Sequence, residues 1–212
     1  RIGIVTRVDL MELSQLNHPL LRRLQDEAPG TFQHSILVGN LAERAADRIG
    51  ANALLVRVGA YYHDIGKLIA PPFFVENLGE ESSPHDNLDP VQSTRVILRH
   101  VTAGIEIARA AGLPEAVVDF IPQHHGTRLA AFFYRRAAAV DPNVDPELFR
   151  YPGPRPRTRE AALVKDAGND FEQALPDRIR ALYPEEPPEV VAEMHAVMIQ
   201  VARSYSLRGG TR

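Results

Sequence analysis

Cysteine is absent from the 212 residues of this chain. A chain without cysteine forms no disulfide, binds no metal through thiolates and uses no cysteine nucleophile. The lack of cysteine also fits a reducing compartment. The sequence has no run of about 20 apolar residues, the length that a membrane-spanning helix needs, and no signal peptide. These residues are therefore expected to contain no membrane span.

An excess of positive charge is also missing. The formal net charge is -3, with 24% charged and 44% hydrophobic residues, which is typical of a globular protein. Without a basic surplus the chain is not expected to hold duplex nucleic acid by neutralising its phosphates. The average charge does not argue against a local site for a small anionic ligand. The length suits one helical domain with its own core.

Strand patterns are scarce, and most long stretches space their apolar residues as helices do. We predict an all-α fold of about eight to ten helices. Thr31, Asn52 and the Asp89-Pro90 pair each provide a capping signal for the helix that follows. The expected helices cover residues 19–27, 31–49, 52–64, 90–111, 114–125, 129–139, 158–174 and 189–204.

The adjacent pair His63-Asp64 is the centre of the functional prediction. It follows the apolar run 54–60 and precedes Gly66 and Lys67. Imidazole offers a neutral nitrogen to a metal, and a carboxylate is able to bridge two cations. The pair could therefore hold one metal ion while the aspartate reaches a second. Such pairs also occur by chance, so the prediction depends on further ligands.

Four more histidines are candidate ligands: His34, His100, His124 and His125. Each lies on or at the end of an expected helix, among apolar neighbours. A lone histidine of this kind is more often a hydrogen-bonded core or surface residue. Five of them with an aspartate fit a mixed imidazole and carboxylate metal site better, because buried imidazoles need partners. The other three histidines are expected to be ordinary: His18, His85 and His195.

The order of these ligands resembles the HD phosphohydrolase superfamily. Longer motifs around them are similar to the cytoplasmic HD domain of the seven-transmembrane HD phosphodiesterases of the PgpH type, over residues 8–164. The matching stretches are NHPLL (17–21), EAPGTFQHS (27–35), VGAYYHDIGK (58–67), FFVEN (73–77), HHGT (124–127) and FRYPGP (149–154).

The resemblance implies an HD-domain helical bundle with a dinuclear metal site in its core, which hydrolyses cyclic di-AMP to pApA. Two divalent transition metal ions, Mn or Fe, would activate a water that bridges them. By position, one ion would take His34, His63 and Asp64. The other would take Asp64, His100, His124 and His125, so that Asp64 bridges the two.

The residues around the ligands suggest contacts to substrate. Lys67, three residues beyond Asp64, is a candidate phosphate contact or simply an exposed lysine. We group it with His63 and Asp64 as catalytic. Thr102 and Thr127 are candidate hydrogen-bond donors to the nucleotide. Four aromatic residues are candidates for stacking on adenine or for the core: Tyr61, Tyr62, Phe73 and Phe74.

One position departs from the family pattern, which has a further aspartate ligand on the helix after the Tyr-Pro-Gly-Pro turn. Read without gaps from Tyr151, that position is Gly168, which has no side chain to ligate with. A one-residue insertion would place Asn169 there. Asp166 and Asp170 lie two residues to either side, about 200° around a helix. Whether Asp166, Asn169 or Asp170 replaces the aspartate stays open.

Two alternatives on function also stay open. One is an HD phosphohydrolase acting on cyclic di-GMP or a nucleoside phosphate. The other is a catalytically weak domain that senses the nucleotide. The family implies a membrane region ahead of Arg1, so the domain is expected at the cytoplasmic face of the cell membrane. Residues 1–18 would then lead in from the membrane, 19–206 would form the HD domain, and 207–212 a frayed tail. A homodimer is a further expectation.

Overall fold

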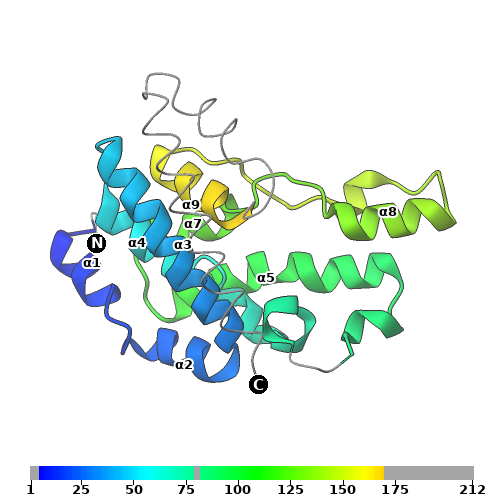
Figure 1. Ribbon diagram of the computed structural model, residues 1–212, viewed down its shortest axis with the longest axis horizontal. Coiled ribbons are helices and arrows are strands. Elements are labelled where there is room, and N and C mark those ends of the chain that lie inside the picture. Colours follow the sequence, from blue (N-terminus) through cyan, green and yellow to red (C-terminus); the bar gives the residue numbers. More distant parts are fainter. Residues whose placement is uncertain (1–4, 79–81, 170–212) are drawn as a thin grey trace, which may run out of the picture. The chain divides into compact units, whose positions relative to one another are not determined.

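The computed structural model describes residues 5–78 and 82–169, shown as ribbon in Figure 1. These residues form helices and turns, and the pairing between Leu129 and Arg150 is an isolated antiparallel bridge rather than a strand. The predicted all-α fold is confirmed. The helix predicted at 189–204, like the end of the one at 158–174, lies outside the described residues. By backbone contacts the chain divides into two compact units, Arg1–Lys165 and Asp166–Arg212.

The described helices are of two kinds. The α-helices are α1 (Arg7–Leu13), α2 (Pro19–Glu27), α3 (Pro29–Arg48), α4 (Ala53–Tyr62), α5 (Pro90–Ala110), α6 (Glu115–Val118), α7 (Phe120–Gln123), α8 (Ala131–Val140) and α9 (Arg159–Asn169). The short 3-10 helices are η1 (Ile65–Ile69), η2 (Pro71–Phe73), η3 (Val75–Asn77), η4 (Pro84–Asn87) and η5 (Pro146–Phe149). None of the helices within the described residues is long and apolar enough to cross a membrane.

Local capping signals set several helix starts. The side chain of Asn52 accepts a hydrogen bond from the backbone N–H of Leu55 at the start of α4. Asp89 accepts from the N–H groups of Val91 and Gln92 at the start of α5. Both caps are as predicted, because a cap depends only on residues two or three positions away.

The prediction that Thr31 caps the next helix is wrong. Helix α3 begins two residues earlier, at Pro29, with Ala28 in the cap position. Proline suits the first turn because its φ angle is already helical and no N–H is lost there. The hydroxyl of Thr31, which is fully buried, donates instead to Glu76, 45 residues away.

The helix predicted at 114–125 is broken into α6 and α7 at Asp119. Pro122 explains the break, because its ring clashes with the carbonyl group four residues earlier, that of Val118. Helix α7 is therefore a single turn, and it ends directly before His124. Because α7 ends at Gln123, the adjacent residues His124 and His125 lie just past its C-terminal end.

The unit Arg1–Lys165 has a hydrophobic core to which α6 and α7 also contribute. It gathers buried side chains from the first helices, α4, η1 and the α6–α7 segment; among them are Leu10, Leu21, Leu24, Tyr62, Ile65, Val117 and Ile121. Each fully buried side chain of this kind stabilises the fold by about 1.5–3 kcal/mol. Leu10 shows that α1, inside the predicted lead-in 1–18, contributes to this core. In Figure 1 the long helix α5 runs alongside α8, which it contacts.

Candidate metal centre

His63 and Asp64 stand at the C-terminal end of α4, which stops at Tyr62. Both side chains are buried, with 1% and 2% of their surface exposed. The chain then turns into η1, where Gly66 packs against α5. A Cβ on Gly66 would lie 1.8 Å from the carbonyl oxygen of His100. Only glycine allows this approach of two backbones, and the approach brings Asp64 next to His100.

The five candidate histidines come from four separate parts of the unit. His34 lies on α3, His63 follows α4, His100 lies on α5, and His124 and His125 follow α7. Potential ligand atoms form two groups, in each of which all atoms lie within 4.8 Å of one another. One group is His34, His63 and Asp64; the other is Asp64, His100, His124 and His125.

The two oxygens of Asp64 face different groups. Oδ2 lies 3.2 Å from Nε2 of His63 and 3.9 Å from Nε2 of His34. Oδ1 lies 3.3 Å from Nε2 of His124 and 3.5 Å from Nε2 of His100. Two ligands of one tetrahedral metal ion with bonds of about 2.0 Å would be about 3.3 Å apart. The carboxylate therefore lies as a bridge between two metal sites would lie.

Backbone contacts orient three of the rings. Nδ1 of His63, His100 and His124 lies 2.6, 2.6 and 2.5 Å from the carbonyl oxygen three residues earlier. When Nδ1–H donates to that carbonyl, Nε2 of the neutral ring carries a lone pair, as metal-bound histidines require.

The lone pairs then point at one another. Nε2 of His100 and Nε2 of His124 are 3.2 Å apart. Oδ1 of Asp64 is buried and accepts no hydrogen bond within the described residues. Electron pairs brought together in a buried place repel unless a cation lies between them. The residues therefore fit divalent metal ions, and their nitrogen and oxygen donors suit transition metals.

Burial favours the neutral, metal-binding form of four of the imidazoles. It lowers the pKa of His34 to about 4 and that of His100 to about 3, against the opposing charge of Asp64. Burial also lowers the pKa of His124 and of His125. For Asp64, burial would raise the pKa, but His63 and Lys67 hold it well below its usual range. The cluster thus combines an ionised carboxylate with four imidazoles that burial favours in the neutral form, those of His34, His100, His124 and His125.

Lys67 belongs to the same cluster. Its ammonium lies 2.9 Å from Oδ2 of Asp64 and 2.6 Å from Oε1 of Glu76. Burial alone would lower the pKa of Lys67, but these two carboxylates raise it. The hydroxyl of Thr31 also donates to Oε1 of Glu76, at 2.9 Å. Asn77 in turn donates to the Thr31 hydroxyl at 2.8 Å. Lys67 is therefore a positioned charge beside the ligands and not an exposed lysine.

The two threonines named from the sequence differ in position. Thr127 lies two residues past His125, and its hydroxyl accepts a hydrogen bond from Arg155 at 3.4 Å. Thr102 is exposed on α5, and its hydroxyl donates to the carbonyl of Arg99. It is two residues from His100, about 200° around the helix. Thr127 therefore stays a candidate beside His125 in the chain, whereas Thr102 faces away from His100 on α5.

Three of the four aromatic candidates for base stacking are core residues. Tyr61, Tyr62 and Phe74 are 6%, 0% and 4% exposed, so no base has access to their faces. Sequence reasoning missed Tyr151, whose ring stacks on His125 with a centroid distance of 3.9 Å. Glu76 was missed as well. Both lie inside motifs already noted, FRYPGP and FFVEN, so the motifs were a signal, but their roles depend on contacts distant in sequence.

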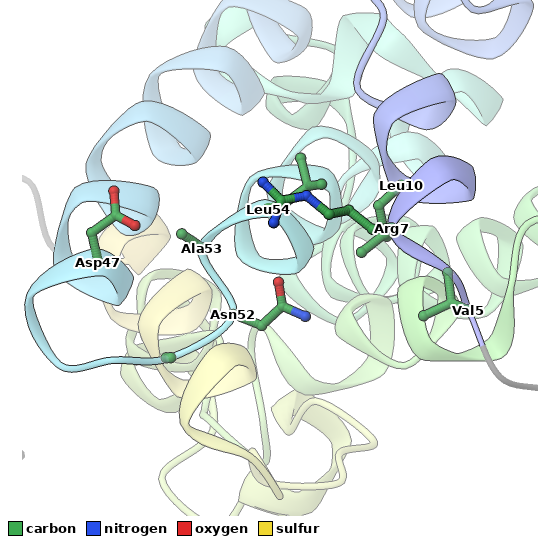
Figure 2. Close-up of a pocket in the computed structure, with 8 residues that line it drawn as sticks. Val5, Arg7, Leu10, Asp47, Asn52, Ala53 and Leu54 are labelled. Carbon is green, nitrogen blue, oxygen red and sulfur yellow. The ribbon is translucent and has the colours of Figure 1, made fainter.

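A separate cavity of about 460 Å³ lies at the other end of α4 (Figure 2). Its lining comes from the start of α1, the end of α3 and the start of α4: Val5, Arg7, Leu10, Asp47, Ala51, Asn52, Ala53 and Leu54. Leu54, the lining residue nearest to His63 along α4, is nine residues from it, about 13.5 Å along the helix. None of the lining residues belongs to either ligand group. The cavity is therefore distinct from the metal cluster.

Comparisons with known proteins agree with this geometry. The chain is 49% identical over 162 residues to the cyclic-di-AMP phosphodiesterase PgpH of Listeria monocytogenes serotype 1/2a (strain 10403S), covering 76% of this chain and 23% of that protein. It is 47% identical over 165 residues to the cyclic-di-AMP phosphodiesterase PgpH of Bacillus subtilis (strain 168), covering 78% of this chain and 23% of that protein. The chain thus spans about a quarter of the length of these relatives.

A solved structure shares the fold. The crystal structure of the L. monocytogenes phosphodiesterase PgpH HD domain in complex with cyclic-di-AMP matches with a TM-score of 0.71 and 40% identity, over 92% of this chain and 87% of that one. The model of the HD domain family matches residues 31–169, which contain every ligand of both groups. This chain therefore belongs to the HD-domain family.

Proposed function

We propose that this domain is a metal-dependent phosphodiesterase that hydrolyses cyclic di-AMP to the linear dinucleotide pApA. The observation that carries the proposal is the position of Asp64, whose two oxygens each face a separate group of histidines. The substrate is taken from the two PgpH relatives and from the PgpH HD domain solved with cyclic-di-AMP.

The ligands proposed for two metal ions, Mn or Fe, are the two groups already described. His34, His63 and Asp64 would hold one ion; Asp64, His100, His124 and His125 would hold the other. When bound, the ions would supply an activated water and positive charge for the phosphate oxygens. The reaction adds one water across one P–O3′ bond and leaves a 5′-phosphate and a 3′-hydroxyl.

The protein's own residues prepare this reaction. Asp64 stays ionised, and the backbone contacts of His63, His100 and His124 fix the direction of their Nε2 atoms. Lys67 is held by Asp64 and Glu76 and is 12% exposed at its side chain. We assign it to a phosphate oxygen of the substrate, because an ammonium fixed by two carboxylates needs no reorganisation as negative charge builds up.

The location and assembly of the whole protein are also proposals. This chain spans 23% of the length of its PgpH relatives. We propose that the domain works at the cytoplasmic face of the cell membrane, with residues 1–18 as the lead-in, 19–206 as the HD domain and 207–212 as a tail, and that it forms a homodimer. Size-exclusion chromatography with light scattering measures the last point.

The test is hydrolysis of cyclic di-AMP by the purified domain with excess Mn²⁺, with the products separated by chromatography. We expect pApA, and its loss on addition of a chelator. The variants Asp64→Asn and His63→Ala should lower the rate by at least a hundredfold. Asp47→Asn, the same change on an exposed aspartate of the separate cavity, should leave it unchanged. Activity that survives both changes at the cluster would sink the proposal.

One observation favours a second candidate, a weak enzyme that binds and senses the nucleotide. The sequence has Gly168 where the family has a further aspartate, and α9 runs through this position. Binding of cyclic di-AMP without turnover would identify a sensor. A panel with cyclic di-GMP and nucleoside phosphates tests the other substrates. Loss of bound metal in Asp166→Asn would show that Asp166 replaces the aspartate.

A further inference from the structure

A turn of the chain lies directly beyond the paired histidines. The N–H of Gly126 donates to the carbonyl of Gln123, and the N–H of Arg128 donates to the carbonyl of His125. Thr127 lies between them. Two residues of chain span at most about 7 Å, so Thr127 stays within that distance of the backbone of His125. Thr127 therefore lies close to one ligand residue of the metal cluster, His125.

A second segment packs against this turn. The N–H of Tyr151 donates to the carbonyl of Arg128 at 2.8 Å, beside the bridge between Leu129 and Arg150. The segment then bends at Gly153, which has a φ of +75°. A Cβ on Gly153 would lie 2.9 Å from the methyl group of Thr127, so a larger residue would push the segment away.

The bend places basic residues around the turn. The Cα of Arg155 and the Cε of Lys165 lie 3.6 Å from where a Cβ on Gly126 would be. Arg128 belongs to the turn itself, and Arg150 donates to the carbonyl of Thr127 at 3.0 Å. This local group of positive charges stands out, since the whole chain carries a net charge of -3. Its place beside a metal cluster that acts on anions suggests a second anionic group in the ligand.

Arg155 is the member best suited to bind that group. Arg150 already pairs with Glu147 at 2.8 Å. The Nε of Arg155 contacts the hydroxyl of Thr127, and no carboxylate in residues 5–78 or 82–169 pairs with its guanidinium. The side chain is exposed. An arginine that keeps N–H donors available fits a phosphate, which accepts two of them at once.

We propose that Arg155, whose Nε contacts the hydroxyl of Thr127 two residues past His125, binds the phosphate of a dinucleotide that is not being hydrolysed. This inference rests on the proposed function and deepens it. It identifies a residue that would make the site bind a ligand with two phosphates more tightly than a ligand with one. The metal cluster and Lys67 take the phosphate that reacts, and Arg155 takes the other.

The test compares Arg155→Gln with the wild-type domain in two measurements. Calorimetry with chelator present gives the Kd of cyclic di-AMP without turnover. Kinetics with Mn²⁺ give kcat/KM for cyclic di-AMP and for bis(p-nitrophenyl) phosphate, a diester with one phosphate. Losing one charge-assisted contact should weaken binding about tenfold. The ratio of the two kcat/KM values should fall by a similar factor, and Arg155→Lys should restore part of it.

Two controls separate this role from a structural one. Arg44→Gln makes the same change on an exposed arginine of α3, about 15 Å along the helix from His34. It should alter neither the ratio of the two kcat/KM values nor the Kd of cyclic di-AMP. Added salt should weaken binding of cyclic di-AMP more in the wild type than in Arg155→Gln, because salt screens exposed charge contacts.

The possible outcomes separate the two proposals. Equal losses for the two substrates, or no change in Kd, would overturn the role of Arg155 while leaving the phosphodiesterase in place. A wild-type domain that binds cyclic di-AMP but yields no pApA would refute the phosphodiesterase. In that case the Kd of Arg155→Gln still decides the inference. A wild-type domain that neither binds cyclic di-AMP nor yields pApA with Mn²⁺ overturns both.

Discussion

Gly66→Ala should disrupt the metal centre without touching a ligand. The added Cβ would lie 1.8 Å from the carbonyl oxygen of His100 and 2.6 Å from the backbone nitrogen of Gly104. Real Cβ contacts essentially never fall below 3.0 Å, so η1 and α5 must separate by about 1.2 Å, since packed backbones do not yield in place. Asp64 precedes this contact and His100 forms part of it, so the separation moves the two ligands apart.

That displacement is large on the scale of metal coordination. Ligand distances in metal sites hold to about 0.2 Å, so a shift of about 1.2 Å removes either Asp64, directly before η1, or His100 on α5 from one shared site. We expect Gly66→Ala to lower the affinity for Mn²⁺ at least a hundredfold. Overpacking should also lower the free energy of unfolding by about 1–3 kcal/mol. Isothermal titration calorimetry with Mn²⁺ measures the affinity. Urea denaturation with chelator present measures the free energy of unfolding.

Gly50→Ala is the matched control. Gly50 has a φ of +64° and nothing within 4 Å of the added Cβ. The substitution should therefore cost about 1–2 kcal/mol of stability through backbone strain, and leave the affinity for Mn²⁺ unchanged. If Gly66→Ala bound Mn²⁺ like the wild type while losing the same stability as Gly50→Ala, the contact between η1 and α5 would not position the ligands.

Three further predictions follow from the contacts of the site. Thr31→Val should lower the free energy of unfolding by about 2 kcal/mol, because it removes the hydrogen bonds of the Thr31 hydroxyl to Glu76 and Asn77; Thr31→Ser should cost less, and equal melting temperatures for the two variants would contradict this. Tyr151→Leu removes the ring stacked on His125 and should weaken Mn²⁺ binding about tenfold, whereas Tyr151→Phe should not; equal affinities in calorimetry would argue against support from the ring. In the metal-free protein, burial lowers the pKa of His34 to about 4, from 6.5. The unfolded chain then binds more protons between these values, so the free energy of unfolding should fall as pH drops from 6.5 to about 4; denaturation midpoints that stay constant over this range would show that the buried histidine does not titrate this way.

The sequence alone determined the local features of this protein. The caps at Asn52 and Asp89 and the helix start at Pro19 depend on residues within one turn, so reading the chain in order was enough to place them. The helical class follows from the spacing of apolar residues. His63 and Asp64 are neighbours in the sequence, so no fold is needed to bring them together. The motif resemblance supplied the assignment of ligands to two metal ions, and the two groups in the structure have the same members.

The tertiary structure decided what joins distant segments. It placed Thr31 on Glu76 instead of at a helix start, enclosed Lys67 between two carboxylates, and stacked Tyr151 on His125. No local pattern encodes these contacts, because each depends on how segments far apart in the chain pack together. The clearest case is Gly66: within its own turn it looks like a flexible glycine, yet only the backbone of α5 shows why a side chain there would separate the ligands.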